Sequence, residues 1–153
     1  MYAVVDSSTL ISLAWSGGLD LITRDHCPLD LVIPAEVRRE TVDEGLALGY
    51  PDAAAIADAI SGAADLDPVD APTVDQAVLI TAKGYGLLLT NDVALGRRAA
   101  NIGVRWLRTG DLVLLCVRTE RVTERRATAV LFGLHDAGRL TSALFEDYLK
   151  ELG

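Results

Sequence analysis

Four acidic side chains lie where strands are expected to end or helices to begin. Asp6 directly follows the apolar stretch AVV. Asp92 comes two residues after the stretch LLLT, with Asn91 between that stretch and Asp92. Glu40 lies on the helix expected after the second strand, and Asp75 opens the helix that leads into LLLT. In open α/β sheets, ligands bind outside the carboxyl ends of the strands. We therefore expect these four acids to converge on one cleft.

Carboxylates that share a cleft repel one another, and a divalent cation relieves this repulsion. Mg²⁺ prefers oxygen ligands, keeps several waters and is commonly held by one or two carboxylates together with substrate phosphates. Such ions can activate water against a phosphodiester. The four acids together therefore favour metal-dependent cleavage of a nucleic-acid strand. For each acid taken alone, helix capping or turn formation is the more frequent role.

Two arginines accompany the proposed cleft. Arg97 and Arg98 follow Asp92 by five and six residues, on a helix that begins at its rim. Guanidinium groups at this place could bind phosphates in a bidentate manner. A solvated helix face with intramolecular ion pairs is the alternative interpretation, and it is the more usual one.

Short apolar strands alternate with helices along the chain. This alternation predicts an α/β fold, a three-layer sandwich in which helices flank a central parallel sheet. The length of 153 residues is typical of a single domain over residues 1–153. We expect strands over 3–5, 29–33, 87–90 and 104–107, and helices from Leu10 to Gly17, after Pro34, and over 52–60, 74–83, 94–100, 111–118, 124–137 and 141–152.

Composition narrows the function classes. The net charge of −8 opposes nucleic-acid binding by attraction over the whole surface, so an RNA substrate needs a local basic patch or bound cations. The longest compact apolar run, LVLLCV, falls far short of the roughly 20 residues of a membrane span. Two cysteines provide neither a disulfide framework nor a four-ligand zinc site. No membrane association is expected, and a cytoplasmic location is the simplest interpretation.

Four blocks of the sequence, in order and with compatible spacing, resemble the motif blocks of the PIN-domain nucleases. The blocks read VVDSSTLISLA, VIPAEVRRE, DQAVLITAKGYGLLLTND and ALGRRAANIGV. The last block and the tail LHDAGRLTSALFEDYLKELG resemble the branch of VapC-type toxins, which has an "R..A...G..V" element and two closing helices. The resemblance covers nearly the whole chain and implies a PIN-like fold.

The resemblance also implies a site and an activity. The acids Asp6, Glu40, Asp75 and Asp92 match the metal-binding and catalytic positions of the family, for Mg²⁺ or Mn²⁺. Ser7, Ser8, Thr90 and Asn91 match its supporting polar positions, which would orient a carboxylate or a water. The implied protein is a cytoplasmic endoribonuclease that cleaves RNA by metal-activated water. It would be the toxin of a VapBC-type toxin–antitoxin pair, a homodimer with a small antitoxin as partner.

One block departs from this branch. The third block usually reads Gly-Glu-x-Glu in the branch, whereas it reads Thr73-Val74-Asp75 here. An alternative function is therefore a non-catalytic PIN-like protein-interaction module with a weakened metal site. A phosphoryl-transferring hydrolase with Asp6 as nucleophile is a third possibility, but the stretch after Asp6 lacks the second aspartate, two residues on, that haloacid-dehalogenase-like enzymes need.

Overall fold

Five parallel strands form the centre of the protein, which a computed structural model describes over all of residues 1–153. The order across the sheet is β3-β2-β1-β4-β5, and every neighbouring pair is parallel. The α/β class and the parallel sheet predicted from the sequence are confirmed. The strands are β1 (Tyr2–Val5), β2 (Asp30–Ile33), β3 (Ala64–Asp65), β4 (Leu87–Leu89) and β5 (Arg105–Leu107).

The strand β3 was not expected from the sequence. It has only two residues, both exposed, and it pairs with the end of β2 through Val32 opposite Ala64. An ion pair of 3.0 Å between the Arg38 guanidinium and the Asp65 carboxylate lies beside it. An exposed edge strand this short has no apolar run or alternation that would distinguish it from a loop.

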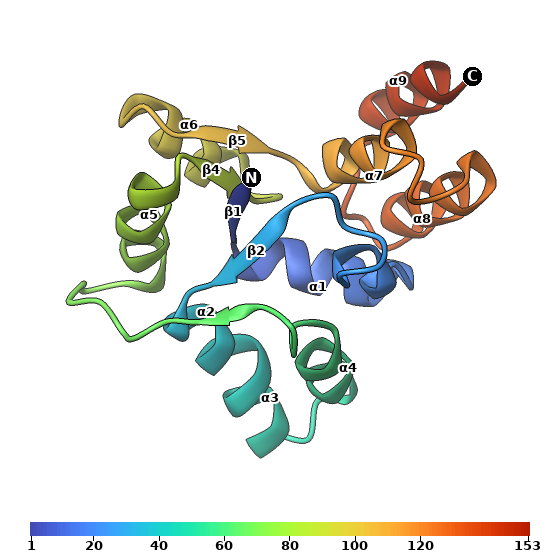
Figure 1. Cartoon of the computed structure of the whole chain (residues 1–153). Helices are drawn as coiled ribbons and strands as arrows, with labels where there is room; N and C mark the ends of the chain where they lie inside the picture. Colours follow the sequence, from blue (N-terminus) through green and yellow to red (C-terminus); the bar gives the residue numbers. More distant parts are fainter.

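Helices cover both faces of the sheet (Figure 1). Helix α1 contacts α4, α7 and α8 on one side, whereas α5 and α6 pack together on the other. This arrangement gives the three layers predicted from the sequence. The helices are α1 (Ser7–Ser16), α2 (Ala35–Arg38), α3 (Glu44–Ala47), α4 (Pro51–Ala59), α5 (Val74–Tyr85), α6 (Val93–Asn101), α7 (Thr109–Arg118), α8 (Glu124–Asp136) and α9 (Ser142–Leu152), with the 3-10 turn η1 (Leu19–Ile22).

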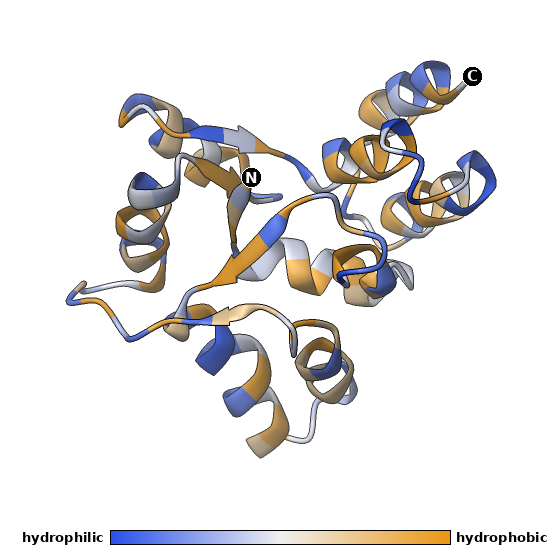
Figure 2. Ribbon diagram, in the orientation of Figure 1, coloured by the Kyte–Doolittle hydropathy of each residue, from blue (hydrophilic) through white to orange (hydrophobic).

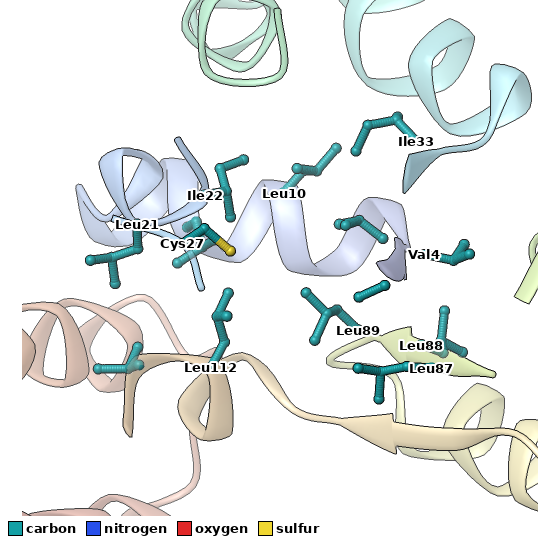
Figure 3. Close-up of a cluster of buried hydrophobic side chains, with 14 of the residues drawn as sticks. Val4, Leu10, Leu21, Ile22, Cys27, Ile33, Leu87, Leu88, Leu89 and Leu112 are labelled. Carbon is teal, nitrogen blue, oxygen red and sulfur yellow. The ribbon is translucent and has the colours of Figure 1, made fainter. Parts of the chain in front are cut away.

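The central strands are apolar because both of their faces are covered by helices (Figure 2). Val4 of β1 and Leu88 of β4 are completely buried and lie opposite each other in the sheet. Leu10 of α1 and Leu112 of α7 approach the same core from the helical layer (Figure 3). This packing holds the carboxyl ends of β1 and β4 next to each other.

The helix predicted after β2 is interrupted. A π-helical turn, η2 (Arg39–Asp43), separates α2 from α3. The Thr41 hydroxyl donates to the Val37 carbonyl at 2.8 Å, a contact that competes with the regular helical hydrogen bonds. Elsewhere the helix ends lie within three residues of the predicted ones: α1 begins at Ser7 rather than Leu10, and α5 continues through Gly84 to Tyr85, with Gly86 after it. None of the helices is both long and apolar enough to span a lipid bilayer.

Candidate active site

The sheet has a topological switch point between β1 and β4. From β1 the chain proceeds to β2 and β3 on one side, and it then returns to β4 and β5 on the other. Ligands bind at the carboxyl ends of the strands at such a point. Val5 pairs with Leu89, so Asp6 and Thr90 are the next residues on the two strands. The Asp6 amide also donates to the Leu89 carbonyl at 3.0 Å. The sheet register therefore places Asp6 at the switch point.

Asp6 is held by two hydroxyl groups. Its side chain is almost fully buried, with 5% of the residue exposed. The Oδ2 atom accepts hydrogen bonds of 2.8 Å from both the Ser8 and the Thr90 hydroxyls. Although Asp6 precedes α1 in the capping position, its carboxylate makes no capping bond to that helix. The capping role that is common for such an aspartate does not apply here, and Oδ1 is left without a hydrogen bond.

The supporting polar residues join the two turns that carry Asp6 and Asp92. The Ser8 Oγ atom accepts the Asn91 amide at 2.9 Å, and the Thr90 Oγ1 atom accepts the Asp92 amide at 3.1 Å. The two hydroxyls also lie 3.2 Å apart. Each hydroxyl thus contacts Asp6 on one strand end and a main-chain amide of the other. Their placement is what an orienting role for a carboxylate requires.

Asp92 has a structural role that leaves part of its carboxylate available. It caps α6, because its Oδ1 atom accepts the Leu95 amide at 3.2 Å. The residue is otherwise exposed to solvent, and its Oδ2 atom makes no hydrogen bond. The capping role considered from the sequence is confirmed for Asp92, and it does not exclude a ligand role for the other oxygen.

The two glutamates after β2 have different partners. The Ser7 hydroxyl donates to Oε2 of the exposed Glu40 at 3.1 Å, which directs this carboxylate toward the end of β1. Glu36 is buried, with 7% of the residue exposed, and its Oε1 atom accepts the Val69 amide at 3.1 Å. The Glu40 carboxylate therefore lies at the candidate site, whereas Glu36 holds residues 66–73, the acidic loop before α5.

Asp75 lies in the electrostatic field of the other two aspartates. It occupies the first turn of α5, which Thr73 caps. Burial raises the pKa of the Asp75 carboxyl above 3.8, and the carboxylates of Asp6 and Asp92 raise it further. The Arg98 guanidinium, 3.8 Å from Oδ2 of Asp75, acts in the opposite direction.

The acids fit an open cation site better than an enclosed one. No three His, Cys, Asp or Glu side chains lie close enough to surround a metal ion by themselves. Besides burial, the carboxylates of Asp6 and Asp92 raise the pKa of Asp75, so these three acids interact electrostatically. Mg²⁺ is commonly held by one or two carboxylates and keeps several waters. The spare oxygens of Asp6 and Asp92 suit such an ion.

The two arginines on α6 differ in whether they form an ion pair. Arg98 pairs with Asp75, as the ion-pair interpretation of the sequence expects, but its side chain remains 47% exposed. Arg97 is exposed and makes no ion pair. Arg98 therefore presents its guanidinium next to the first turn of α5, whereas Arg97 is exposed to solvent on the same helix.

A cavity of about 460 Å³ lies between Asp92 and the α8–α9 turn. Its lining residues are Ser8, Asn91, Asp92, Val93, Gly138, Arg139, Leu140, Thr141 and Leu144. The turn residues among them were not expected in the site, because nothing in the sequence indicates that this turn meets the end of β4. A second cavity, of about 410 Å³, lies at the opposite edge, where Tyr2 and Asp30 begin their strands.

Comparison of the chain with protein-family models, with curated proteins and with solved structures finds no match. The functional interpretation therefore depends on the site itself and on the resemblance of the four sequence blocks.

Proposed function

We propose that the protein is a metal-dependent endoribonuclease of the PIN-domain type, the toxin of a VapBC-type pair. The observation that carries this proposal is the environment of Asp6. A buried carboxylate at the switch point has two hydroxyl donors on one oxygen and none on the other. Two further aspartates, Asp75 and Asp92, lie nearby: besides burial, the charges of Asp6 and Asp92 raise the pKa of Asp75. Arg98 pairs with Asp75, but Asp6 and Asp92 have no ion-pair partner, and a divalent cation would supply one.

The residues that would hold Mg²⁺ or Mn²⁺ are Asp6 and Asp92, with Asp75 and Glu40 binding directly or through water. When bound, the cation would lower the pKa of an attacking water and offset the charge of the phosphodiester. The protein side chains would define where the cation and the attacking water bind. Ser8 and Thr90 fix the orientation of Asp6, and Ser7 fixes that of Glu40.

The RNA strand would lie across the rim of the site. Arg97 and Arg98 offer guanidinium groups to phosphates that flank the cleaved bond, and such contacts position a strand without reading its sequence. Local arginines are needed because the net charge of −8 repels a polyanion elsewhere. The cavity beside Asp92 gives space for a nucleotide next to the cleaved bond.

Partners are proposed from the same resemblance: a second copy of the chain and a small antitoxin in the cytoplasm. Three large apolar side chains at the end of α3 support association with a protein. Leu46, Leu48 and Tyr50 are 53%, 67% and 61% exposed. Exposed apolar groups that cluster in this way are typical of interaction surfaces.

RNA cleavage in the presence of Mg²⁺ or Mn²⁺ tests the proposal. We expect wild-type protein to cut RNA, chelation by EDTA to stop cleavage, and Asp6→Asn or Asp92→Asn to reduce the rate at least about 100-fold. Attack by water displaces the 3′ oxygen and leaves 5′-phosphate and 3′-hydroxyl ends. Asp43→Asn is the matched control, because Asp43 is an exposed acid in η2 without a hydrogen bond to the site.

Equal cleavage by wild type, Asp6→Asn and Asp92→Asn would contradict the proposal. Ends that carry a 2′,3′-cyclic phosphate would contradict attack by water, since they form when the 2′-hydroxyl of RNA attacks its own phosphate.

A second candidate function is a non-catalytic interaction module. The ion pair between Arg98 and Asp75 favours it, because this contact partly neutralises the third-block acid without any cation. Titration with Mn²⁺ separates the two functions. Binding that is lost in Asp6→Asn supports the nuclease, and absence of binding supports the interaction module.

A further inference from the structure

Three residues from distant parts of the chain form a closed ring beside the acids. The Arg139 guanidinium Nη2 donates to the Ser8 carbonyl at 3.3 Å, and the Ser8 hydroxyl accepts the Asn91 amide at 2.9 Å. The Asn91 side-chain Nδ2 then donates to the Arg139 carbonyl at 2.8 Å. The ring therefore connects the first turn of α1, directly after Asp6, with the β4–α6 turn and the α8–α9 turn.

The local structure of the α8–α9 turn fixes where Arg139 points. Gly138 has φ +71°, a left-handed conformation that glycine adopts without strain. The Gly138 amide donates to the His135 carbonyl, and the Arg139 amide donates to the Leu134 carbonyl. These two bonds make a Schellman motif, which ends α8 and holds the next residue in a defined direction.

The Arg139 side chain is further constrained on α1. Its Nε donates to the Ser12 hydroxyl at 2.8 Å, and its guanidinium lies 5.1 Å from the centre of the Trp15 ring. The Ser12 hydroxyl in turn donates to the Ser8 carbonyl at 2.6 Å. The guanidinium thus contacts α1 at three residues, while the main chain of Arg139 contacts the β4–α6 turn.

We propose that Arg139 is a positioning residue that sets the spacing of the two acid-bearing turns, and that the α8–α9 turn is thereby part of the nuclease site. This inference rests on the proposed function. Arg139 does not reach Asp6 or Asp92 directly. It acts through Ser8, which bonds to Asp6, and through Asn91, which precedes Asp92.

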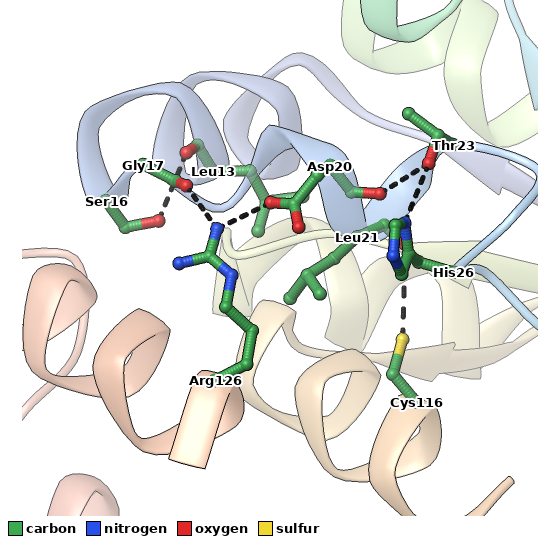
Figure 4. A network of polar contacts seen from close by, with 9 residues as sticks. All are labelled: Leu13, Ser16, Gly17, Asp20, Leu21, Thr23, His26, Cys116 and Arg126. Atoms are coloured by element: carbon green, nitrogen blue, oxygen red, sulfur yellow. Dashed lines mark hydrogen bonds and ion pairs between the residues drawn. The ribbon is translucent and has the colours of Figure 1, made fainter. Parts of the chain in front are cut away.

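A second arginine provides a matched control (Figure 4). Arg126 of α8 also contacts the end of α1: its Nη2 donates to the Gly17 carbonyl at 2.8 Å and to the Asp20 carboxylate at 2.6 Å. Its partners Gly17 and Asp20 lie beyond the last residue of α1, whereas Arg139 contacts Ser8, Ser12 and Trp15 within that helix. Loss of Arg126 weakens the packing of α8 on α1 without touching the acid-bearing turns.

Amide hydrogen exchange tests the inference without metal or RNA. In Arg139→Ala we expect exchange of the Asn91 amide to accelerate about 10-fold relative to the Val5 amide in the sheet. In Arg126→Ala we expect the Asn91 amide to keep its relative protection. Arg139→Lys should restore part of it, because one ammonium group can bond to Ser8 or Ser12 but cannot reproduce both contacts.

Mn²⁺ affinity gives the second measurement. Arg139→Ala should weaken binding about 10-fold, and Arg126→Ala should leave it unchanged once the fraction of folded protein is taken into account. Unchanged relative exchange at Asn91 in Arg139→Ala, or equal effects of the two arginine variants on it, would overturn the inference. Wild-type protein that binds no Mn²⁺ would instead overturn the proposed function, and the exchange experiment would still decide whether Arg139 sets the turns.

Discussion

Asp6 and Thr90, which are the first residues beyond neighbouring strands, are joined by a hydrogen bond of 2.8 Å from the Thr90 hydroxyl to Oδ2 of Asp6. Thr90 is completely buried, and its hydroxyl also accepts the Asp92 amide. One side chain thereby fixes two acids at the switch point of the sheet. The geometry of the candidate site is therefore a direct consequence of the pairing of β1 with β4.

Thr90→Val removes this hydroxyl while preserving the shape of the side chain. We expect Mn²⁺ affinity to fall about 10–100-fold, because the orientation of Asp6 loses one of its two donors. The Asp92 amide also loses its acceptor, so the free energy of unfolding should fall by about 1–3 kcal/mol. Calorimetric titration and thermal denaturation measure these effects.

Thr9→Val is the control for this change. Thr9 is as buried as Thr90 and lies in α1, but its hydroxyl has no hydrogen-bond partner. Its replacement should leave stability unchanged or raise it, with no change in Mn²⁺ affinity. A loss of affinity as large as that of Thr90→Val would show that the effect does not depend on Asp6.

Substitutions of Glu36 and Glu40 should have separate effects, one on stability and the other on cation affinity. Glu40→Ala removes an exposed carboxylate, so stability should change by no more than about 0.5 kcal/mol while Mn²⁺ affinity falls. Glu36→Ala leaves the Val69 amide without its acceptor and should cost about 1–3 kcal/mol, with cation affinity retained in the folded protein. The reverse pattern would assign the site carboxylate to Glu36.

Asp75→Asn should stabilise the metal-free protein at neutral pH. The pKa of Asp75 in the folded protein lies above the value of 3.8 expected when unfolded, so the folded state binds more protons between these two values. Wild-type stability consequently falls as pH rises through that window, and the penalty is complete above the folded pKa. An asparagine does not ionise and avoids the penalty.

Thermal unfolding of both proteins from pH 7 to pH 4 in EDTA measures the difference. The advantage of Asp75→Asn should shrink as the pH approaches 3.8. Added Mn²⁺ should reverse the order, because the cation stabilises only the wild-type carboxylate cluster. An advantage that stays constant over this range would contradict ionisation of the Asp75 carboxyl as its cause.

Two helical glycines should respond oppositely to alanine. A Cβ at Gly96 of α6 would overlap the Trp106 ring, so Gly96→Ala should destabilise the protein by about 1–3 kcal/mol. Gly84 of α5 has open space around it, and Gly84→Ala should stabilise the protein by about 0.5–1 kcal/mol. Chemical denaturation of both variants checks the packing of α6 on β5. Equal effects would contradict it.

Local sequence patterns predicted the fold well wherever a strand is a continuous apolar run or a helix ends at a glycine. The buried strand at Leu87–Leu89 and the helix stop at Gly17 are examples. The two-residue strand β3 and the π turn at Glu40 were not predicted, since neither has a distinct pattern and both depend on contacts with other elements.

The candidate site was predicted only in part. The positions of Asp6 and Asp92 follow from strand ends that meet at a parallel sheet edge. The contribution of Arg139 could not be predicted, because it depends on how the α8–α9 turn packs on α1, far away in the sequence. The resemblance selected Glu40 over Glu36, but the different partners of these two glutamates, Ser7 and Val69, depend on contacts with distant segments that no local pattern indicates.

A crystal of the protein soaked in Mn²⁺ and measured for anomalous scattering tests the central claim most directly. We predict an anomalous peak in contact with the Asp6 carboxylate and next to Asp92, and no such peak in Asp6→Asn crystals. A Mn²⁺-soaked wild-type crystal without a peak at Asp6, or with its peak on the acidic loop before α5, would contradict the account.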